Sequence, residues 1–223
     1  MTNQEILSHI DHTLLKAVAS WEDIKKLCDE SLAYKTASVC IPPSYIRRVY
    51  EAYHAKGITI GTVVGFPLGY SVTPVKIREA EEAVAQGASE IDMVLNIGDI
   101  KNRDFDKVHE EIASLKQGVG AKILKVIIET CYLTEAEKIR LCEIVTAAKA
   151  DYIKTSTGFG TGGAMLEDIL LFKNHIGSQV KIKAAGGVKT REDLEVFLSA
   201  GCDRIGTSSA VALLTGGCGA GAC

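Results

Sequence analysis

Three segments of the sequence align without gaps as helix end, turn and strand: Gly87-Ala-Ser-Glu-Ile91-Asp92, Lys149-Ala-Asp-Tyr-Ile153-Lys154 and Gly201-Cys-Asp-Arg-Ile205-Gly206. Each segment lies two strand–helix units after the one before it. Equal units of this kind are typical of a parallel sheet built from repeated βα pairs. Ordinary turn chemistry between a helix and a strand would give the same repeat, so by itself the repeat indicates a fold and no function.

This alternation extends along the whole chain. Short β-branched runs alternate with amphipathic stretches of about 12 to 16 residues, and each predicted strand is followed by a predicted helix. Eight strands are expected, at residues 10–14, 37–41, 59–66, 91–96, 124–129, 152–155, 181–185 and 204–207. The sequence therefore predicts an α/β fold, a single parallel (β/α)8 TIM barrel.

Start signals support the predicted helices. Proline follows Thr73 in the first turn of one helix, where its missing N–H leaves no bond unmade. No Gly/Ser-rich or Pro-rich linker interrupts the alternation before residue 215, so we expect one domain over residues 1–223 with a short Gly/Cys-rich tail from about residue 215. Three other helices begin with a capping box: Ser20-x-x-Asp23, Thr134-x-x-Glu137 and Thr190-x-x-Asp193.

The composition excludes several classes of protein. The 223 residues are 47% hydrophobic, enough to bury a sizeable core, and a net charge of −3 gives no electrostatic footprint for nucleic acid or an anionic membrane. The N-terminus lacks the basic and apolar regions of a signal peptide, and no apolar run approaches the roughly 20 residues that span a bilayer. We therefore expect a cytoplasmic protein with no nucleic-acid or membrane partner.

The cysteines predict neither a disulfide framework nor a metal site. Seven are present, and no CxxC pair has ligand spacing. Outside a small secreted scaffold such thiols are expected to stay free. No His/Cys/Asp cluster has the spacing of a zinc site, so we expect no metal.

The repeat also predicts which side chains point inward. Because side chains alternate between the two faces of a strand, Ile91 and Ile153 should face the covering helices, while Asp92 and Lys154 should face the barrel axis. Two ionisable groups that point into a packed barrel are hard to explain as structure. They indicate an active site, which in such barrels lies at the C-terminal ends of the strands.

Three lysines, Lys125, Lys154 and Lys183, lie in predicted strands among apolar neighbours, 29 residues apart in both intervals. The spacing predicts that they converge from consecutive strands at comparable levels. A lysine amine is nucleophilic only when neutral, and a neighbouring cation lowers its pKa, so Lys183 favours a nucleophilic Lys154. The alternative is that one or more of them extends from a strand end into solvent. Lys181, nearer the strand start, is expected at the surface.

Acidic residues flank the same region. Asp92 follows Glu90 at i+2 on the inward face, where it could hold a water or the lysines and act in proton transfer. A structural salt bridge with one of the lysines is the alternative. On the first strand, Asp11 and His12 could reach the same end of the barrel, although a lone histidine there is more often a satisfied core residue.

Glycine-rich turns follow the last three predicted strands: Ser156-Thr157-Gly158, Gly186-Gly187-Val188-Lys189 and Gly206-Thr207-Ser208-Ser209. Backbone N–H groups in such turns, with a helix N-terminus behind them, form an anion site, and the loops after strands seven and eight are its usual place in this architecture. Each turn alone is also what a tight βα connection needs. Together they predict that a phosphorylated small molecule binds beside the lysines, with Lys189 assisting electrostatically.

These motifs resemble a known family. Six segments, in the same order along residues 8 to 210, are similar to signature segments of the deoxyribose-phosphate aldolases: Ile10-Asp-His-Thr-Leu14, Gly65-Phe-Pro-Leu-Gly69, Glu90-Ile-Asp-Met93, Lys125-Val-Ile-Ile-Glu-Thr130, Ile153-Lys-Thr-Ser-Thr-Gly158 and Lys183-Ala-Ala-Gly-Gly-Val188. Ile-Lys-Thr-Ser-Thr-Gly is the most specific of them. The resemblance implies a class I, Schiff-base aldolase that needs neither metal nor cofactor.

Carried over position by position, the resemblance implies a Schiff-base lysine at Lys154, a second active-site lysine at Lys183 and a catalytic aspartate at Asp92. Three further positions match the mouth of the family's active site: Asp11, Cys40 and Lys125. The expected substrate-binding loops, from the resemblance and from the turns above, comprise Thr157, Gly158, Gly186, Gly187, Lys189, Gly206, Ser208 and Ser209.

The implied reaction is the reversible cleavage of 2-deoxy-D-ribose 5-phosphate to D-glyceraldehyde 3-phosphate and acetaldehyde, a carbon–carbon lyase step in deoxyribonucleotide catabolism and carbohydrate degradation. The implied partners are small phosphorylated sugars, aldehydes and further copies of the chain, in a dimer or tetramer. Two alternatives stay open. One is a transaldolase-like Schiff-base aldolase acting on a different sugar phosphate, and the other is a catalytically silent sugar-phosphate sensor or scaffold.

The sequence departs from the family at its C-terminus. After residues 210–214 it ends in Thr-Gly-Gly-Cys-Gly-Ala-Gly-Ala-Cys223, which is too rich in glycine for the longer closing helix expected of such a barrel. Some family members carry a C-terminal tyrosine that contributes to proton transfer, and this sequence has none there. The departure bears on the protonation step and on any lid formed by the tail, and it leaves the core chemistry as implied.

Overall fold

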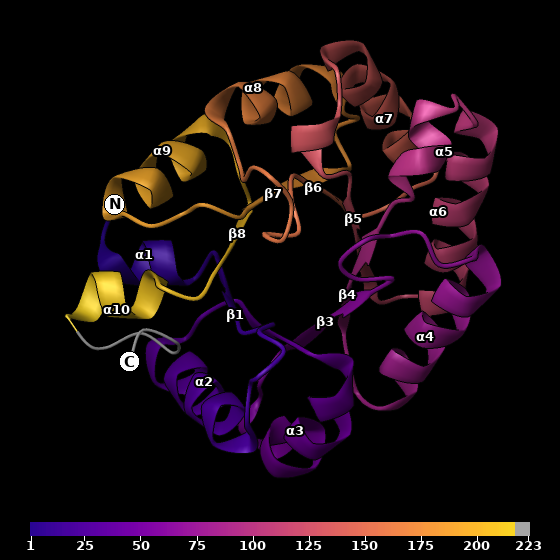
Figure 1. The fold of residues 1–223 in the computed structure, drawn as a ribbon. Helices are drawn as coiled ribbons and strands as arrows, with labels where there is room; N and C mark the ends of the chain where they lie inside the picture. Colours follow the sequence, from indigo (N-terminus) through magenta and orange to yellow (C-terminus); the bar gives the residue numbers. More distant parts are fainter. Residues whose placement is uncertain (217–223) are drawn as a thin grey trace.

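Eight parallel strands close into a barrel in the order β1 to β8 in the computed structural model, which describes residues 1–216 (Figure 1). Pairing of β1 with β8, in which Ile10 lies opposite Ile205, completes the ring. This confirms the predicted (β/α)8 barrel. The strands are β1 (Ile10–Thr13), β2 (Ser38–Ile41), β3 (Ile60–Val64), β4 (Glu90–Val94), β5 (Ile123–Ile127), β6 (Tyr152–Lys154), β7 (Lys181–Ala185) and β8 (Arg204–Thr207).

Several strands end before the apolar runs that predicted them, because the last residues of those runs already turn into the loops. After β3, for example, Gly65 has a φ of +63°, a conformation in which a strand cannot continue. A single domain over residues 1–223 stays a prediction. Most of the Gly/Cys-rich tail lies outside the described residues.

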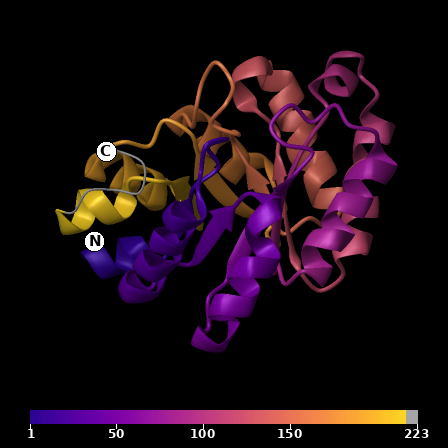
Figure 2. The same ribbon diagram turned by 60° about the horizontal axis from the view of Figure 1, so that its bottom comes forward.

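The helices form a ring around the strands (Figure 1 and Figure 2). At least one helix follows each strand, as predicted, and a short α1 also precedes β1, where it packs beside α10. Within residues 1–216, no helix is long and apolar enough to cross a membrane. The helices are α1 (Asn3–Leu7), α2 (Trp21–Tyr34), α3 (Ile46–Tyr53), α4 (Thr73–Ala85), α5 (Ile97–Lys101), α6 (Phe105–Val119), α7 (Glu135–Ala147), α8 (Leu166–His175), α9 (Arg191–Ala200) and α10 (Ala210–Thr215).

The predicted helix starts are confirmed. Ser20, Thr134 and Thr190 each cap their helix, and in each case the acidic residue at the third helical position accepts a hydrogen bond in return. Pro74 lies in the first turn of α4. A fourth capping box, Thr2 with Glu5, starts α1. These caps satisfy backbone N–H groups that the helices leave without partners.

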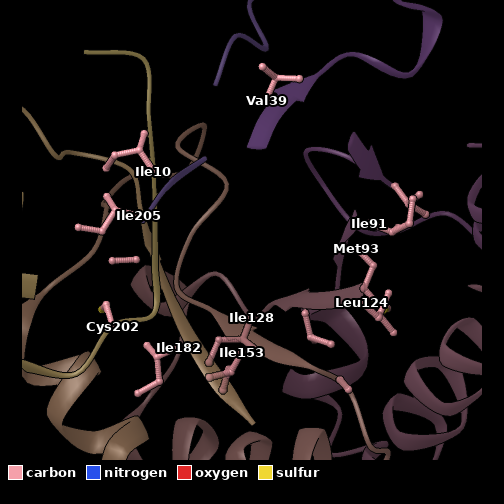
Figure 3. Packing of buried hydrophobic residues seen from close by; sticks show 14 of the residues in the cluster. Ile10, Val39, Ile91, Met93, Leu124, Ile128, Ile153, Ile182, Cys202 and Ile205 are labelled. Atoms are coloured by element: carbon pink, nitrogen blue, oxygen red, sulfur yellow. The ribbon is translucent and has the colours of Figure 1, made fainter. Parts of the chain in front are cut away.

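The main hydrophobic core lies between the strands and the helices. Ile91, Ile153 and Ile205, the isoleucines of the repeat, are completely buried in it (Figure 3). The inward face that they leave free is occupied by polar and charged side chains. The alternation predicted from the repeat is therefore confirmed.

One buried ion pair lies outside the barrel, between α4 and α6. Lys76 is completely buried, and its Nζ lies 2.7 Å from Glu111 Oε1 and donates to the carbonyl oxygen of Val94 at 2.9 Å. The other oxygen of Glu111 accepts a hydrogen bond from the Thr73 hydroxyl at 2.9 Å. The pair thus ties two helices to the end of β4, the strand that carries Asp92.

Removing one partner of this pair should destabilise the fold strongly. In Lys76→Met the carboxylate of Glu111 loses its cation while it stays buried, and we expect the free energy of unfolding to fall by about 3 kcal/mol or more. Urea unfolding followed by circular dichroism measures the change. The control is Lys101→Met, because the Lys101–Glu137 pair is 43% and 19% exposed, and a loss below about 1 kcal/mol is expected there. Equal small losses in both variants would contradict the structural role of Lys76.

Candidate active site

A cavity of about 390 Å³ opens at the C-terminal ends of the strands. Lys154 lines its inner end, and loops that follow β1, β6, β7 and β8 form its walls. Eight of the predicted substrate-binding positions line this one cavity: Thr157, Gly158, Gly186, Gly187, Lys189, Gly206, Ser208 and Ser209. The structure thus places Lys154 and the three glycine-rich turns in the same space.

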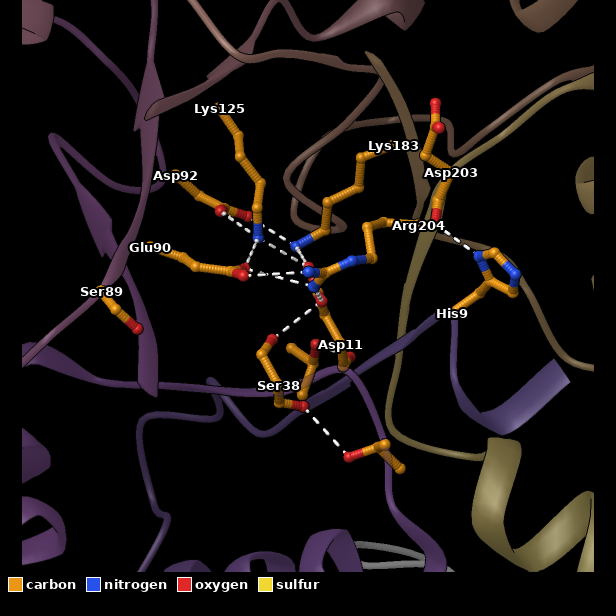
Figure 4. A network of polar contacts seen from close by, with 12 residues as sticks. His9, Asp11, Ser38, Ser89, Glu90, Asp92, Lys125, Lys183, Asp203 and Arg204 are labelled. Atoms are coloured by element: carbon orange, nitrogen blue, oxygen red, sulfur yellow. Dashed lines mark hydrogen bonds and ion pairs between the residues drawn. The ribbon is translucent and has the colours of Figure 1, made fainter. Parts of the chain in front are cut away.

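Asp92 is the point at which the three lysines meet. Its Oδ2 lies 2.7 Å from Lys154 Nζ and 2.7 Å from Lys183 Nζ, and its Oδ1 lies 3.2 Å from Lys125 Nζ. Figure 4 shows Lys125, from β5, and Lys183, from β7, reaching toward this carboxylate. The lysines therefore converge as predicted. Their side chains point into the barrel and do not extend into solvent.

The prediction that all three lysines stand at comparable levels is wrong for Lys125. Across the β6–β7 pair Lys154 lies opposite Lys183, but across the β5–β6 pair Lys125 lies opposite Tyr152. Lys125 is therefore two residues nearer the strand starts than Lys154. Equal spacing along the sequence did not predict this difference in level. The register between neighbouring strands depends on the tilt of the strands in the barrel and cannot be read from the number of residues between them.

Beneath Asp92 the barrel interior holds a second layer of charges. Lys125 Nζ lies 2.8 Å from Asp11 Oδ2 and 2.6 Å from Glu90 Oε2. Arg204, on β8, pairs with Glu90 at 3.0 Å and with Asp11 (Figure 4). Lys183 links the two layers, because its Nζ lies 2.5 Å from Asp11 and 2.7 Å from Asp92.

Among these groups, Lys154 is the lysine whose pKa is lowered. Burial is the largest cause, and the charge of Lys183 adds to it, while the carboxylate of Asp92 opposes both. The predicted effect of Lys183 thus has the expected direction but is smaller than the effects of burial and of Asp92. A lysine with a lowered pKa has more of the neutral amine that a nucleophile requires.

The partners of Lys154 hold their charges. Burial alone would raise the pKa of Asp92, but the charges of Lys125, Lys154 and Lys183 outweigh it and keep that pKa well below its usual range. Burial alone would lower the pKa of Lys183, but Asp11 and Asp92 keep it above the ordinary lysine value. At neutral pH the site therefore contains a carboxylate and an ammonium beside Lys154.

The three other predicted substrate-binding residues lie inside the barrel and away from the cavity wall. Asp11 is completely buried, Cys40 is 2% exposed and Lys125 is 1% exposed. Burial raises the pKa of the Cys40 thiol, so it stays protonated. Contact of these residues with a substrate stays a prediction. His12 points the other way and bonds Glu30 of α2 at 2.8 Å, which makes it a core residue.

Glycine permits the shape of the loops around the cavity. Gly186 and Gly187 have φ of +81° and +75°, and side chains are rarely tolerated in that conformation. At Gly163 a Cβ would lie 2.4 Å from the carbonyl oxygen of Gly186, so the loop after β6 can approach the loop after β7 only without a side chain. Backbone therefore lines much of the cavity wall.

The helix N-terminus expected behind the loop after β7 is already occupied. Asp193 accepts hydrogen bonds from the backbone N–H groups of Lys189 and Thr190, both at 2.9 Å, within the capping box of α9. A phosphate in the cavity would therefore meet the loop backbone and the exposed side chain of Lys189 before this helix end.

Sequence reasoning missed Glu129. This buried residue has a φ of +53°, and its carboxylate accepts hydrogen bonds from the Thr157 N–H, at 3.1 Å, and from the Thr157 hydroxyl. Glu129 thus holds the turn that leads to Gly158 at the cavity wall. An acidic residue in a sparsely populated backbone conformation is the kind of position that function retains, but no spacing rule predicts it.

Two further features were not predicted. Lys16, after β1, also lines the cavity. Phe66 and Phe159 pack edge to face, with ring centroids 5.2 Å apart, and join the loops after β3 and β6.

Within residues 1–216, no group of three or more histidine, cysteine or acidic side chains is placed to hold a metal ion.

Comparison with known proteins identifies the family. A family model described as DeoC/LacD family aldolase matches residues 6–216. A deoxyribose-phosphate aldolase of Clostridium botulinum is 68% identical over 216 residues, 97% of each chain, and one of Clostridioides difficile is 58% identical over 211 residues, 95% of this chain and 96% of its own. The crystal structure of a putative deoxyribose-phosphate aldolase from Coccidioides immitis has a TM-score of 0.93 and 35% identity, covering 97% of this chain and 87% of its own. The chain therefore belongs to the DeoC/LacD family of aldolases.

Proposed function

We propose that this aldolase reversibly cleaves 2-deoxy-D-ribose 5-phosphate to D-glyceraldehyde 3-phosphate and acetaldehyde through a Schiff base on Lys154. One observation carries the proposal: a buried lysine with a lowered pKa lines the same cavity as three glycine-rich loops. The names of the curated relatives support the choice of substrate. They favour it over the transaldolase-like alternative, and the lysine–aspartate cluster favours an enzyme over a silent sensor.

In the first steps neutral Lys154 attacks the C1 aldehyde of the open-chain sugar. Loss of water from the resulting carbinolamine leaves an iminium, which accepts electrons from the C2–C3 bond when the C3 hydroxyl is deprotonated. The C3 fragment leaves as glyceraldehyde 3-phosphate, and the C1–C2 fragment stays on Lys154 as an enamine. Protonation at C2 and hydrolysis of the iminium then release acetaldehyde and restore the amine.

Asp92 and Lys183 are suited to move the protons. Asp92 Oδ2 lies 2.7 Å from Lys154 Nζ and 2.7 Å from Lys183 Nζ, so a water held by Asp92 and Lys183 beside Lys154 can take the C3 hydroxyl proton. The carboxylate of Asp92 has too low a pKa to keep that proton, and Lys183 carries one of its own. The proton taken from the C3 hydroxyl is therefore passed on through the water and delivered to C2 of the enamine, so that none accumulates on Asp92 or Lys183.

The glycine-rich loops would hold the phosphate of the substrate. They lie on the same cavity as Lys154, and Lys16 and Lys189 add positive charge to its wall. Fixing the phosphate there would leave the aldehyde end of the sugar directed toward Lys154. Positioning of this kind is a large part of the catalytic effect of any binding site.

We also propose a cytoplasmic homo-oligomer, a dimer or tetramer. The free thiols of the five described cysteines are typical of a reducing compartment. The solved deoxyribose phosphate aldolase from Aeropyrum pernix, which is 29% identical with a TM-score of 0.87, is described as tetrameric. Mass measurement in solution tests the assembly.

Borohydride reduction in the presence of 2-deoxy-D-ribose 5-phosphate should trap a covalent adduct on Lys154, located by peptide mapping. In Lys154→Leu the adduct should be lost and cleavage should fall by about a thousandfold or more, because the nucleophile is gone. Lys181→Leu is the matched control, since that lysine is exposed at the start of β7. An adduct on another lysine, or full activity in Lys154→Leu, would reject the mechanism. Trapping with fructose 6-phosphate alone would favour the transaldolase-like alternative.

Replacing Lys183 by leucine should raise the pKa of Lys154, because a like charge is removed and Asp92 is left to pair with Lys154 more strongly. The neutral amine would then appear only at higher pH. The rate of adduct formation with acetaldehyde and cyanoborohydride, measured against pH, should shift its rising limb upward by about one unit or more. Lys183→Arg keeps the charge and should shift much less. An unchanged limb in Lys183→Leu would show that its charge does not act on Lys154.

Removing the charge of Lys189 should weaken substrate binding more than catalysis. In Lys189→Ala we expect KM for 2-deoxy-D-ribose 5-phosphate to rise by about tenfold with a smaller change in kcat, as for a group that binds ground state and transition state equally. Initial-rate kinetics measures both. Cleavage of unphosphorylated 2-deoxy-D-ribose should be unaffected. A fall in kcat at constant KM would contradict a binding role.

A further inference from the structure

Seven charged side chains fill the barrel below the cavity and form one connected cluster, which we call the barrel ion network. Each is 16% exposed or less. Every member contacts at least one member of opposite charge. The network consists of four basic residues, Lys125, Lys154, Lys183 and Arg204, and three acidic residues, Asp11, Glu90 and Asp92.

The basic members share the carboxylates unequally. Lys125 contacts all three of them, and Lys183 and Arg204 contact two each. Among the described residues, Lys154 forms an ion pair with Asp92 alone, on the same oxygen that Lys183 contacts. With four basic groups and three carboxylates, one basic group has no carboxylate to balance it, and Lys154 is the one with the fewest contacts.

We propose that Arg204 is a positioning residue for the reaction: it supplies the third permanent cation of the network and thereby keeps Lys154 unprotonated. This inference deepens the proposed function and rests on Lys154 being its nucleophile. Arg204 acts through other residues, because its guanidinium contacts Asp11 and Glu90, near the strand starts. It is not among the residues that line the cavity within the described part of the chain.

The physical reason is the cost of net charge among buried side chains. A buried charge is tolerated when it is paired, and an unpaired one tends to neutralise. With Arg204, Lys125 and Lys183 charged, the three carboxylates are balanced and Lys154 is left to be neutral. The directions of the pKa shifts agree, because the pKa of each of those three residues is raised and that of Lys154 is lowered.

Within residues 1–216, the neighbouring titratable groups outside the network leave this balance unchanged. Cys40, on β2, has its pKa raised by burial and stays a neutral thiol, and burial likewise raises the pKa of Tyr152, which is not a member of the network. At the cavity wall, Lys16 and Lys189 are exposed cations. They are identical in every variant below, so they do not contribute to differences between variants.

Arg204→Met tests the inference. With three basic groups left for three carboxylates, Lys154 should take up a proton to restore balance. We expect the pH midpoint for modification of Lys154 to rise by about one unit or more. Reductive methylation with formaldehyde and cyanoborohydride across a pH series, read on the Lys154 peptide by mass spectrometry, gives this midpoint without any turnover. If the wild-type chain does not cleave 2-deoxy-D-ribose 5-phosphate, the proposed function is wrong. The pH midpoint of Lys154 can still be measured in that case, because the methylation does not depend on cleavage.

Two matched variants separate charge balance from mere loss of structure. Arg204→Lys keeps the cation and should leave the midpoint near the wild-type value. The double variant Arg204→Met with Glu90→Gln removes one charge of each sign and should bring the midpoint back down, although it disturbs the packing more. Thermal unfolding of each variant confirms that it is folded.

Glu90→Gln alone provides a test that does not need Arg204→Met to fold. It removes a carboxylate and leaves the cations in greater excess. The pH midpoint for modification of Lys154 should therefore stay the same or fall. A rise in this variant would overturn the inference. An unchanged midpoint in folded Arg204→Met, or a double variant that keeps the full upward shift, would overturn it as well.

Discussion

The carboxylate of Asp92 is the interaction on which the rest of the site depends. One of its oxygens contacts both Lys154 and Lys183 at 2.7 Å, and all three side chains are buried. Without that charge two buried ammonium groups would face each other, and both would tend to lose their protons. With it, one lysine keeps its proton and the other is the easier to deprotonate. Asp92 raises the pKa of both lysines, but burial outweighs its effect at Lys154, whereas at Lys183 Asp11 and Asp92 together outweigh burial.

The geometry of the barrel makes this arrangement of charged side chains possible. Alternate side chains of every strand point inward, so residues far apart in the sequence meet at the axis. Barrels of this kind usually fill that space with branched apolar side chains. Here, charged groups occupy much of it, and the apolar packing lies between strands and helices, where Ile91, Ile153 and Ile205 are completely buried. The outward faces of the strands therefore supply the apolar packing that stabilises the fold, and the inward faces of the same strands supply the charged groups of the site.

Local sequence patterns predicted the elements and the inward faces well. Period-two alternation placed Asp92 and Lys154 correctly because it depends only on strand geometry, and the capping boxes were confirmed because they are local hydrogen bonds. The level of Lys125 was predicted wrongly because inter-strand register is a tertiary property. Arg204 was overlooked as a strand-start residue, since nothing nearby in the sequence shows that its long side chain reaches Glu90, on β4.

A charged interior of this kind limits which amino-acid substitutions the barrel can accept. Replacing one member of a buried ion pair leaves its partner without compensation, whereas replacing a whole set by apolar groups can be neutral or stabilising. Stability alone would therefore favour an apolar barrel, and the charges have to be explained by function. A neutral amine is what the proposed Schiff-base chemistry requires. In the proposed mechanism the second layer of charges helps to keep Lys154 unprotonated, so the residues that set the reactivity of Lys154 extend below the cavity that it lines.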